Sequence, residues 1–209
     1  MKYPKAIGPA LLATVAVAVL FAAPSAGATV LCKNTTTTPC SAKYPAKTTL
    51  SFALQTGTSL VFEENLVEGE GLTLDKCTSS AIASSTENEG GAGEAVKAKV
   101  ETKGWTWAGC SRNTITEAGG QFEIQWIPGS NHGTVIANKF KIRVETFLYG
   151  VCIFLFEGAD FGTLTEGMPA QLDVNAAVTE DVNKNCPPTR MTATFLATAP
   201  TTTLAVAEK

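Results

Sequence analysis

The chain has 209 residues, with 16 Lys and Arg against 19 Asp and Glu, a formal net charge of −3 and a pI of ≈ 5.3. A mildly acidic chain lacks the strongly basic surface that nucleic acids and anionic membranes attract, so we expect neither as a partner. The length is sufficient for one domain with a substantial core.

The first 28 residues are typical of a secretory signal peptide. Lys2 and Lys5 form a short positive region, an apolar segment follows, and Ala26-Gly27-Ala28 offers a cleavage site. A membrane anchor is the alternative, but glycine and proline interrupt the apolar stretch. We therefore expect residues 1–28 to be removed and residues 29–209 to form a single secreted domain of net charge −5, without membrane insertion after cleavage.

All six cysteines lie after residue 28, and an even number in an exported chain predicts disulfides. They are Cys32, Cys40, Cys77, Cys110, Cys152 and Cys186. A zinc site would need closely spaced ligand pairs, and neither a Cys-x-x-Cys pair nor a second histidine occurs in the sequence. We predict sequential pairing, 32–40, 77–110 and 152–186, and no metal or other cofactor.

The remaining sequence predicts a succession of strands and no helix. Segments rich in β-favouring residues alternate with clusters of Gly, Pro, Asn and Glu, and the expected strands are 48–54, 59–65, 72–80, 95–103, 121–127, 134–148, 151–156, 171–179, 191–198 and 202–208. Residues 151–156, VCIFLF, are apolar on both faces and predict a strand covered on both sides. The fold class is therefore all-β, an antiparallel β-sandwich with a β-barrel-like arrangement as the alternative.

The hairpin around the PGSNHG turn is the clearest local pattern. Phe122, Ile124 and Trp126 share one predicted face, and the next strand places Ile136, Phe140, Ile142, Val144 and Leu148 inward. The outward positions of that strand are Lys139, Lys141, Arg143 and Glu145. We expect Glu123 to lie opposite Lys139 or Lys141, depending on register.

Several short motifs resemble a family. They are Leu31-Cys32-Lys33, Pro39-Cys40, Tyr44-Pro45-Ala46, Thr48, Gly57-Thr58, Cys77-Thr78-x-Ser80, Gly109-Cys110 and Cys186-Pro187. Together they resemble uncharacterised secreted, multi-cysteine all-β proteins of soil actinobacteria. The resemblance implies an extracellular location and a loop closed by a disulfide at the N-terminus. It transfers no catalytic residue, because these proteins carry no assigned activity.

Catalytic patterns are weak in this sequence. His132 is the sole histidine, it lies in a turn, and no Gly-x-Ser-x-Gly motif accompanies it. Acidic residues cluster near turns and could serve a glycosidase or bind calcium, but such residues usually keep a surface soluble. They are Glu63, Glu64, Glu68, Glu70, Glu87, Glu89, Glu94, Glu157 and Asp160.

Two binding patterns remain. Trp105 and Trp107 lie on one side of an expected strand, where they either stack on sugar rings or pack in the core beside Cys110. The stripe Lys139, Lys141 and Arg143 either meets an anionic polymer or is simply solvated. We expect a secreted, non-enzymatic protein with a binding or structural role at the cell envelope or outside the cell, with polysaccharide as a candidate partner. The alternative function is a secreted carbohydrate-active hydrolase that uses loop carboxylates.

Overall fold

The computed structural model describes residues 29–34, 40–64, 72–111, 114–146, 149–178, 180–182 and 186–209. The predicted signal peptide, Pro39, Glu68, Glu70 and Leu148 lie outside these ranges. The regular structure of the described residues consists of strands: β1 (Thr29–Cys32), β2 (Thr49–Leu54), β3 (Leu60–Glu64), β4 (Thr73–Thr86), β5 (Val96–Val100), β6 (Trp105–Cys110), β7 (Thr114–Trp126), β8 (Gly133–Thr146), β9 (Gly150–Phe156), β10 (Ala159–Thr165), β11 (Gln171–Ala177), β12 (Glu180–Asp181), β13 (Thr189–Ala199) and β14 (Ala205–Glu208). The all-β prediction is confirmed, and every named pairing is antiparallel.

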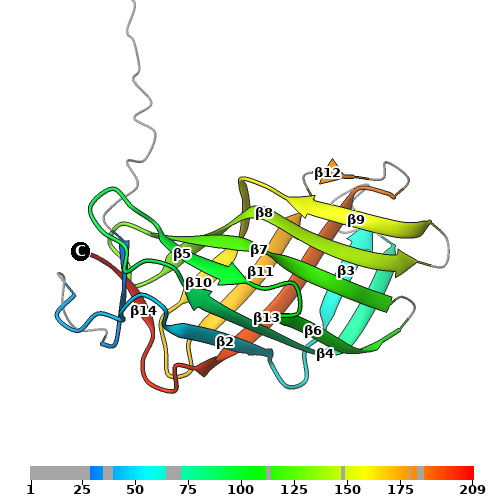
Figure 1. Ribbon diagram of the computed structural model, residues 1–209. Coiled ribbons are helices and arrows are strands. Elements are labelled where there is room, and N and C mark those ends of the chain that lie inside the picture. Colours follow the sequence, from blue (N-terminus) through cyan, green and yellow to red (C-terminus); the bar gives the residue numbers. More distant parts are fainter. Residues whose placement is uncertain are drawn as a thin grey trace, which may run out of the picture.

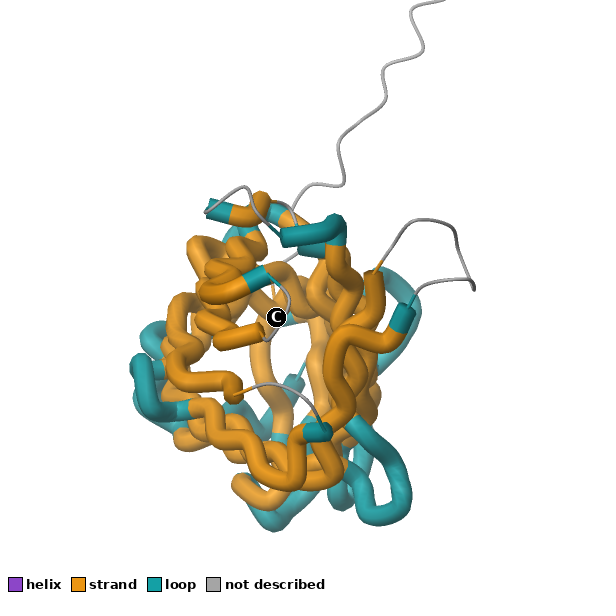
Figure 2. Tube along the Cα trace, turned by 90° about the vertical axis from the view of Figure 1, so that its right-hand side faces the viewer, coloured by secondary structure: helices purple, strands orange, loops and turns teal. Residues whose placement is uncertain are grey.

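Twelve of the strands form one sheet that closes on itself. The path runs β10-β11-β13-β2-β4-β5-β7-β8, and a further pairing of β8 with β10 completes the ring. Figure 1 shows the long strands crossing the molecule side by side, and Figure 2 shows them end-on as a ring. This closure corresponds to the barrel-like alternative, while the opposed halves of the ring remain compatible with a sandwich description.

Long strands of the ring are interrupted rather than continuous. β2 and β3 both pair with β4 and β13, and residues 55–59 loop out between them. In the same way, β5 and β6 both pair with β4, and β9 and β10 both pair with β8. Interruptions and bulges of this kind are a common means by which a closed sheet curves around its contents.

Aromatic side chains fill the interior of the ring. Trp105, Phe140, Phe161 and Phe195 are each at most 2% exposed, and the Trp105 ring lies 5.6–6.0 Å from each of the three phenylalanine rings. An apolar void lined by Leu50, Phe122 and their neighbours measures only ≈ 20 Å³. Side-chain packing therefore occupies the interior, as in closed sheets too narrow to enclose a large ligand.

A separate two-stranded ladder closes one end of the ring. β1 pairs with β14 from Thr29↔Glu208 to Cys32↔Ala205, so the first and last described strands lie side by side (Figure 1). Thr29 is 1% exposed, and its Oγ1 accepts a hydrogen bond from the Trp126 amide at 2.9 Å. These contacts attach the ladder to the end of β7.

The predicted disulfide pairing is confirmed. Cys32 bonds Cys40, Cys77 bonds Cys110 and Cys152 bonds Cys186. The second bridge joins directly opposed residues of β4 and β6, whereas the third connects β9 to the segment before β13. Three disulfides are consistent with folding in an oxidising, extracellular environment.

The expected register of the β7–β8 hairpin is wrong. Trp126 pairs with Gly133 across the turn, so Glu123 lies opposite Ile136, not a lysine, and accepts a hydrogen bond from the Asn138 side chain at 3.2 Å. A bulge at Lys139 (φ 52°) then shifts the alternation by one residue. Ile136 therefore points outward, whereas Phe140, Ile142 and Val144 point inward as predicted.

The apolar strand at residues 151–156 is covered unequally. Cys152, Phe154 and Phe156 are fully buried, while the outward positions 151, 153 and 155 are half-buried. Residues 159–165, which are not among the strands expected from the sequence, form β10 and close the ring. In the described part of the chain, no helix is long and apolar enough to cross a membrane.

Candidate functional site

A groove of ≈ 620 Å³ lies on the described surface over β5, β7, β8 and β9, and we call it the β8 groove. Val100, Gly119 and Gly120 contribute to its lining near the end of β5, and Ile153 and Val182 lie at the β9 side. Its charged lining residues are Glu87, Lys99, Glu101, Lys139, Lys141 and Arg143. Four cations and two carboxylates give the groove a net positive charge in a chain whose overall charge is negative.

Two of the four cations lack a carboxylate partner among the described residues. Lys139 and Lys141 are exposed, and neither is within ion-pair distance of a described carboxylate. Arg143 donates from Nη1 to Glu145 Oε1 at 2.8 Å, and both side chains are substantially exposed. The β8 stripe predicted from the sequence thus lies on a concave surface, with two cations available to an anionic group.

The opposite side of the groove adds a cation from β5. Lys99 Nζ lies 2.9 Å from Glu101 Oε1. The hydrogen bond from Lys99 to Glu101, together with the charges of Glu101 and Glu87, raises the pKa of Lys99 above its ordinary value of 10.5, against a small opposing effect of desolvation. Glu87 in turn accepts a hydrogen bond from the Gln121 side chain. Both groove carboxylates are therefore already engaged.

A pair of glycines explains why the sheet is hollow at this point. A Cβ at Gly119 would lie 3.0 Å from Thr102 Cα, and one at Gly120 (φ 152°) would lie 2.5 Å from Phe140 Cα. Opposite them, Lys139 forms the bulge of β8. Bare glycine backbone and a bulge together lower the floor of the groove and turn Lys139 outward.

The tryptophan pair lies at the interior side of β6. Trp105 is 2% exposed and donates from Nε1 to Ser80 Oγ at 2.7 Å, while the half-buried Trp107 stacks on it with ring centroids 5.4 Å apart. Trp107 Nε1 is buried without a hydrogen-bond partner in the described structure. Trp105 therefore packs in the core, which was the alternative to stacking on a sugar ring. Sugar binding by the pair stays a prediction, confined to the half-buried ring of Trp107.

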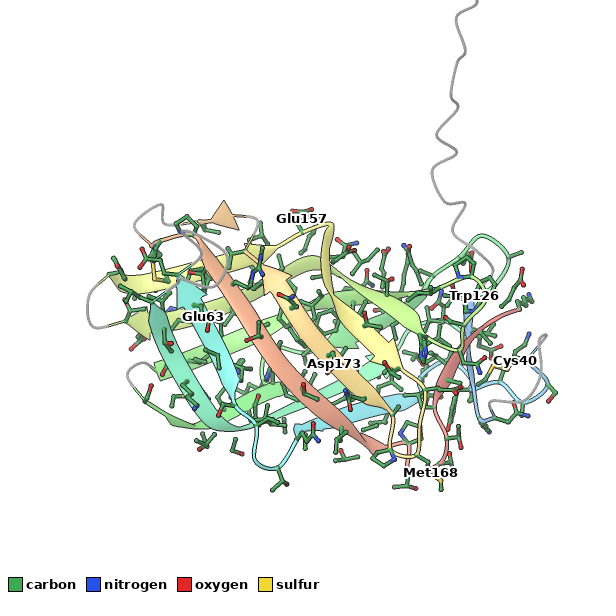
Figure 3. The ribbon with its side chains drawn as sticks, turned by 180° about the vertical axis from the view of Figure 1, so that it is seen from behind. Cys40, Glu63, Trp126, Glu157, Met168 and Asp173 are labelled. Atoms are coloured by element: carbon green, nitrogen blue, oxygen red, sulfur yellow. A yellow bond between two sulfur atoms is a disulfide. The ribbon has the colours of Figure 1, made fainter. Side chains whose placement is uncertain are left out.

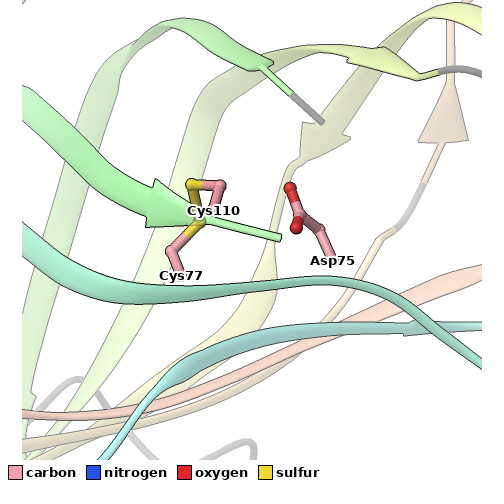
Figure 4. Close-up of side chains that lie close together, drawn as sticks. All are labelled: Asp75, Cys77 and Cys110. Atoms are coloured by element: carbon pink, nitrogen blue, oxygen red, sulfur yellow. A yellow bond between two sulfur atoms is a disulfide. The ribbon is translucent and has the colours of Figure 1, made fainter. Parts of the chain in front are cut away.

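Asp75, Cys77 and Cys110 bring three potential metal-ligand atoms within 4.8 Å of one another (Figure 4). Both sulfurs belong to a disulfide and are not thiolates. Asp75 Oδ1 accepts hydrogen bonds from the Lys76 amide at 2.8 Å, the Ser111 amide at 2.9 Å and the Ser111 hydroxyl at 3.0 Å. The cluster therefore holds the end of β6 against β4, and its chemistry does not fit a metal.

His132 has a structural environment. Its Nδ1 accepts a hydrogen bond from the Glu166 amide at 3.3 Å, and its own amide donates to Ser130 Oγ at 3.1 Å. The Ser130 hydroxyl donates to the Ile127 carbonyl at 2.7 Å instead of to the imidazole. This arrangement stabilises the β7–β8 turn, and it differs from the serine–histidine contact that nucleophilic catalysis requires.

The acidic candidates with described positions are distributed over several elements. Glu63 is on β3, Glu157 is at the bend between β9 and β10, and Glu87 follows β4 (Figure 3 labels the first two). Among those acidic candidates whose positions the structure describes, only Glu87 lines the β8 groove. The β8 groove therefore brings together four cations but only one of the described carboxylates that were predicted from the sequence.

Comparisons with protein-family models, with curated proteins and with solved structures give no match for this chain. The resemblance to secreted actinobacterial proteins consequently stays a prediction from the sequence motifs alone.

Sequence reasoning found the β8 part of the groove and missed the rest. Lys99, Gln121 and Asn138 join the groove from three strands, and Lys99↔Gln121 and Gln121↔Asn138 are register pairs. The alternation of residues 95–103 places Lys99 outward, but nothing in the sequence indicates that β5 lies beside β7. Only the pairing of these strands brings the fourth cation to the stripe.

Proposed function

We propose that this protein is a secreted, non-enzymatic binding protein that holds an anionic polymer of the cell envelope or its surroundings in the β8 groove. The observation that carries the proposal is the convergence of Lys99, Lys139, Lys141 and Arg143 on one groove. The three disulfides support an extracellular site of action.

Charge and shape both favour a polymer with carbon-rich units. The cations attract carboxylate, phosphate or sulfate groups, and low salt strengthens such exposed contacts. Ile153 and Val182 provide apolar surface beside Arg143, against which a sugar or alkyl unit can pack. An inorganic anion would make no use of this apolar side.

The test is equilibrium binding of the purified protein to polygalacturonate, with neutral dextran as the uncharged control, at about 0.01 M and about 0.15 M salt. We expect binding to polygalacturonate that weakens as salt rises, and none to dextran. The combined variant Lys139→Gln, Lys141→Gln and Arg143→Gln should lose about 3- to 150-fold in affinity at low salt, because each exposed ion pair contributes about 0.2–1 kcal/mol.

A variant with the same charge change controls for net charge. Lys43, Lys76 and Lys209 are exposed and do not line the groove, so their combined replacement by Gln should leave affinity nearly unchanged. An equal loss in both variants would show that binding follows overall charge and would refute the groove as the site. Preferential binding to dextran would refute an anionic ligand.

Export is tested independently of binding. We expect the mature protein in the culture medium to begin at Thr29, as read by N-terminal sequencing. An intact leader on an intracellular product would contradict the secreted location.

A further inference from the structure

Two amide side chains lie among the cations of the β8 groove. Gln121 on β7 and Asn138 on β8 are a register pair, and Lys99 on β5 lies opposite Gln121 on its other side. Asn138 directly precedes Lys139, the bulge residue of β8. All four residues line the groove, so each amide has a cation as its neighbour.

A carboxylate fixes the orientation of each amide. Gln121 donates from Nε2 to Glu87 Oε2, and Asn138 donates from Nδ2 to Glu123 Oε1 at 3.2 Å. An ionised carboxylate only accepts hydrogen bonds, so each amide presents its nitrogen to the carboxylate and turns its carbonyl oxygen away. Neither carbonyl oxygen accepts a hydrogen bond from the described part of the chain. The pair therefore offers two oriented acceptors to donors on a ligand.

The other polar residues of the groove also favour hydroxyl groups on the ligand. Glu87 and Glu101 line the groove, and their carboxylates accept hydrogen bonds and repel anions. The exposed Thr102 adds a hydroxyl that can donate or accept. A ligand made only of anionic groups has no donor for these acceptors, whereas an uncharged ligand makes no use of Lys139 and Lys141.

We propose, extending the function proposed above and depending on it, that the ligand is an acidic polysaccharide whose hydroxyls donate hydrogen bonds to Gln121 Oε1 and Asn138 Oδ1. Its anionic groups bind Lys139 and Lys141, the groove lysines without a described carboxylate partner. Directly opposed residues of neighbouring strands have Cβ atoms about 4.5–5.5 Å apart, so the hydroxyls of one sugar unit can reach both amides. The cations supply the attraction, and the amides select hydroxylated units among anionic chains.

The experiment compares two ligands of identical charge and length. They are trigalacturonate with free hydroxyls and trigalacturonate with all of its hydroxyls O-methylated, each titrated into the purified protein by NMR at about 0.01 M salt. A net neutral hydrogen bond changes affinity by about 2- to 12-fold, so two such bonds should make the free-hydroxyl ligand bind about fourfold or more tightly. Equal affinity of the two ligands, or tighter binding of a capped triglutamate peptide than of trigalacturonate, would overturn hydroxyl recognition.

Matched variants locate the acceptors. Asn138→Leu and Gln121→Met nearly preserve side-chain size and remove the amide, so each should weaken the free-hydroxyl ligand by about 2- to 12-fold and leave the O-methylated ligand unchanged. Asn175→Leu is the control, because Asn175 is exposed on β11 and does not line the groove. Lys141→Gln should weaken both ligands alike. Unchanged melting temperatures of the variants would show that the fold is retained.

The outcomes separate this inference from the proposed function. If the amide variants weaken neither ligand, or weaken both alike, hydroxyl recognition is wrong, while a loss of affinity with Lys141→Gln still supports an anion-binding groove. If neither trigalacturonate nor polygalacturonate binds at low salt, both proposals fail.

Discussion

The interior of the ring and the β8 groove lie on opposite faces of the same strands, and they differ in almost every property. The interior holds Trp105, Phe140 and Phe161 in direct ring contacts and leaves almost no space. The groove is concave, charged and floored by glycine. The interior determines stability, and the outer face is available for binding, so changes on the two faces should separate the two properties.

The largest expected effect comes from the centre of the interior. Trp105→Ala should lower the free energy of unfolding by about 3–5 kcal/mol, because it leaves a cavity among three phenylalanine rings and removes the partner of Ser80. Urea denaturation measures the loss. Trp105→Phe should cost less, and polymer binding by the folded fraction should be unchanged. A Trp105→Ala variant of full stability would contradict the packed interior.

The second-largest effect should come from removing a disulfide, and the loss of stability should depend on the length of the loop that the bridge closes. Replacing Cys77 and Cys110 together by Ala opens a separation of 33 residues and should cost about 3.5–4 kcal/mol. The same change at Cys32 and Cys40, with a separation of 8, should cost about 2.5 kcal/mol. Thermal melting of the two double variants, side by side, tests the order. The reverse order would show that chain entropy does not control these bridges.

Gly120 connects the two faces, since it lines the β8 groove while an added Cβ there would lie 2.5 Å from the Cα of the buried Phe140. Gly120→Ala should destabilise by about 1–3 kcal/mol through the close approach to Phe140 Cα and should also reduce polymer affinity. Gly129→Ala is the matched control, because Gly129 also has a positive φ (77°) but no atom within 4 Å of an added Cβ. Equal losses in both variants would attribute the effect to backbone strain alone.

The smallest effect is electrostatic and confined to the groove. Glu101→Gln should lower the pKa of Lys99, because Glu101 is the main cause of its rise. A group whose pKa is higher in the folded than in the unfolded state stabilises the folded state at pH values below its unfolded-state pKa. That contribution disappears as the pH rises through the folded-state pKa. NMR titration of the Lys99 side chain measures the shift, with Lys76 as the internal reference. An unchanged Lys99 titration would contradict the pair.

The sequence predicted the strands and the disulfides better than the arrangement of the groove. Alternation located the inward positions of β7 and most of those on β8, because period-two burial is a local property. Ile136 was assigned to the wrong face because the bulge at Lys139 depends on how β8 meets Gly119 and Gly120 across the ladder. The burial of Trp105 and the position of Lys99 beside the β8 cations likewise depend on which strands become neighbours. No local sequence pattern carries that information.

The pairing of β1 with β14 joins the two ends of the described chain. Apart from β13 and β2, neighbours in the ring are at most two strands apart in the sequence, so hairpins such as β7–β8 can form as soon as both of their strands are available. The β1–β14 ladder, in contrast, connects Thr29 to Glu208, and β2 must wait for β13. During synthesis the early strands emerge long before their partners, and such distant contacts slow folding. We therefore expect a protein that assembles progressively from its middle and acquires its final cooperativity only when the last strand docks.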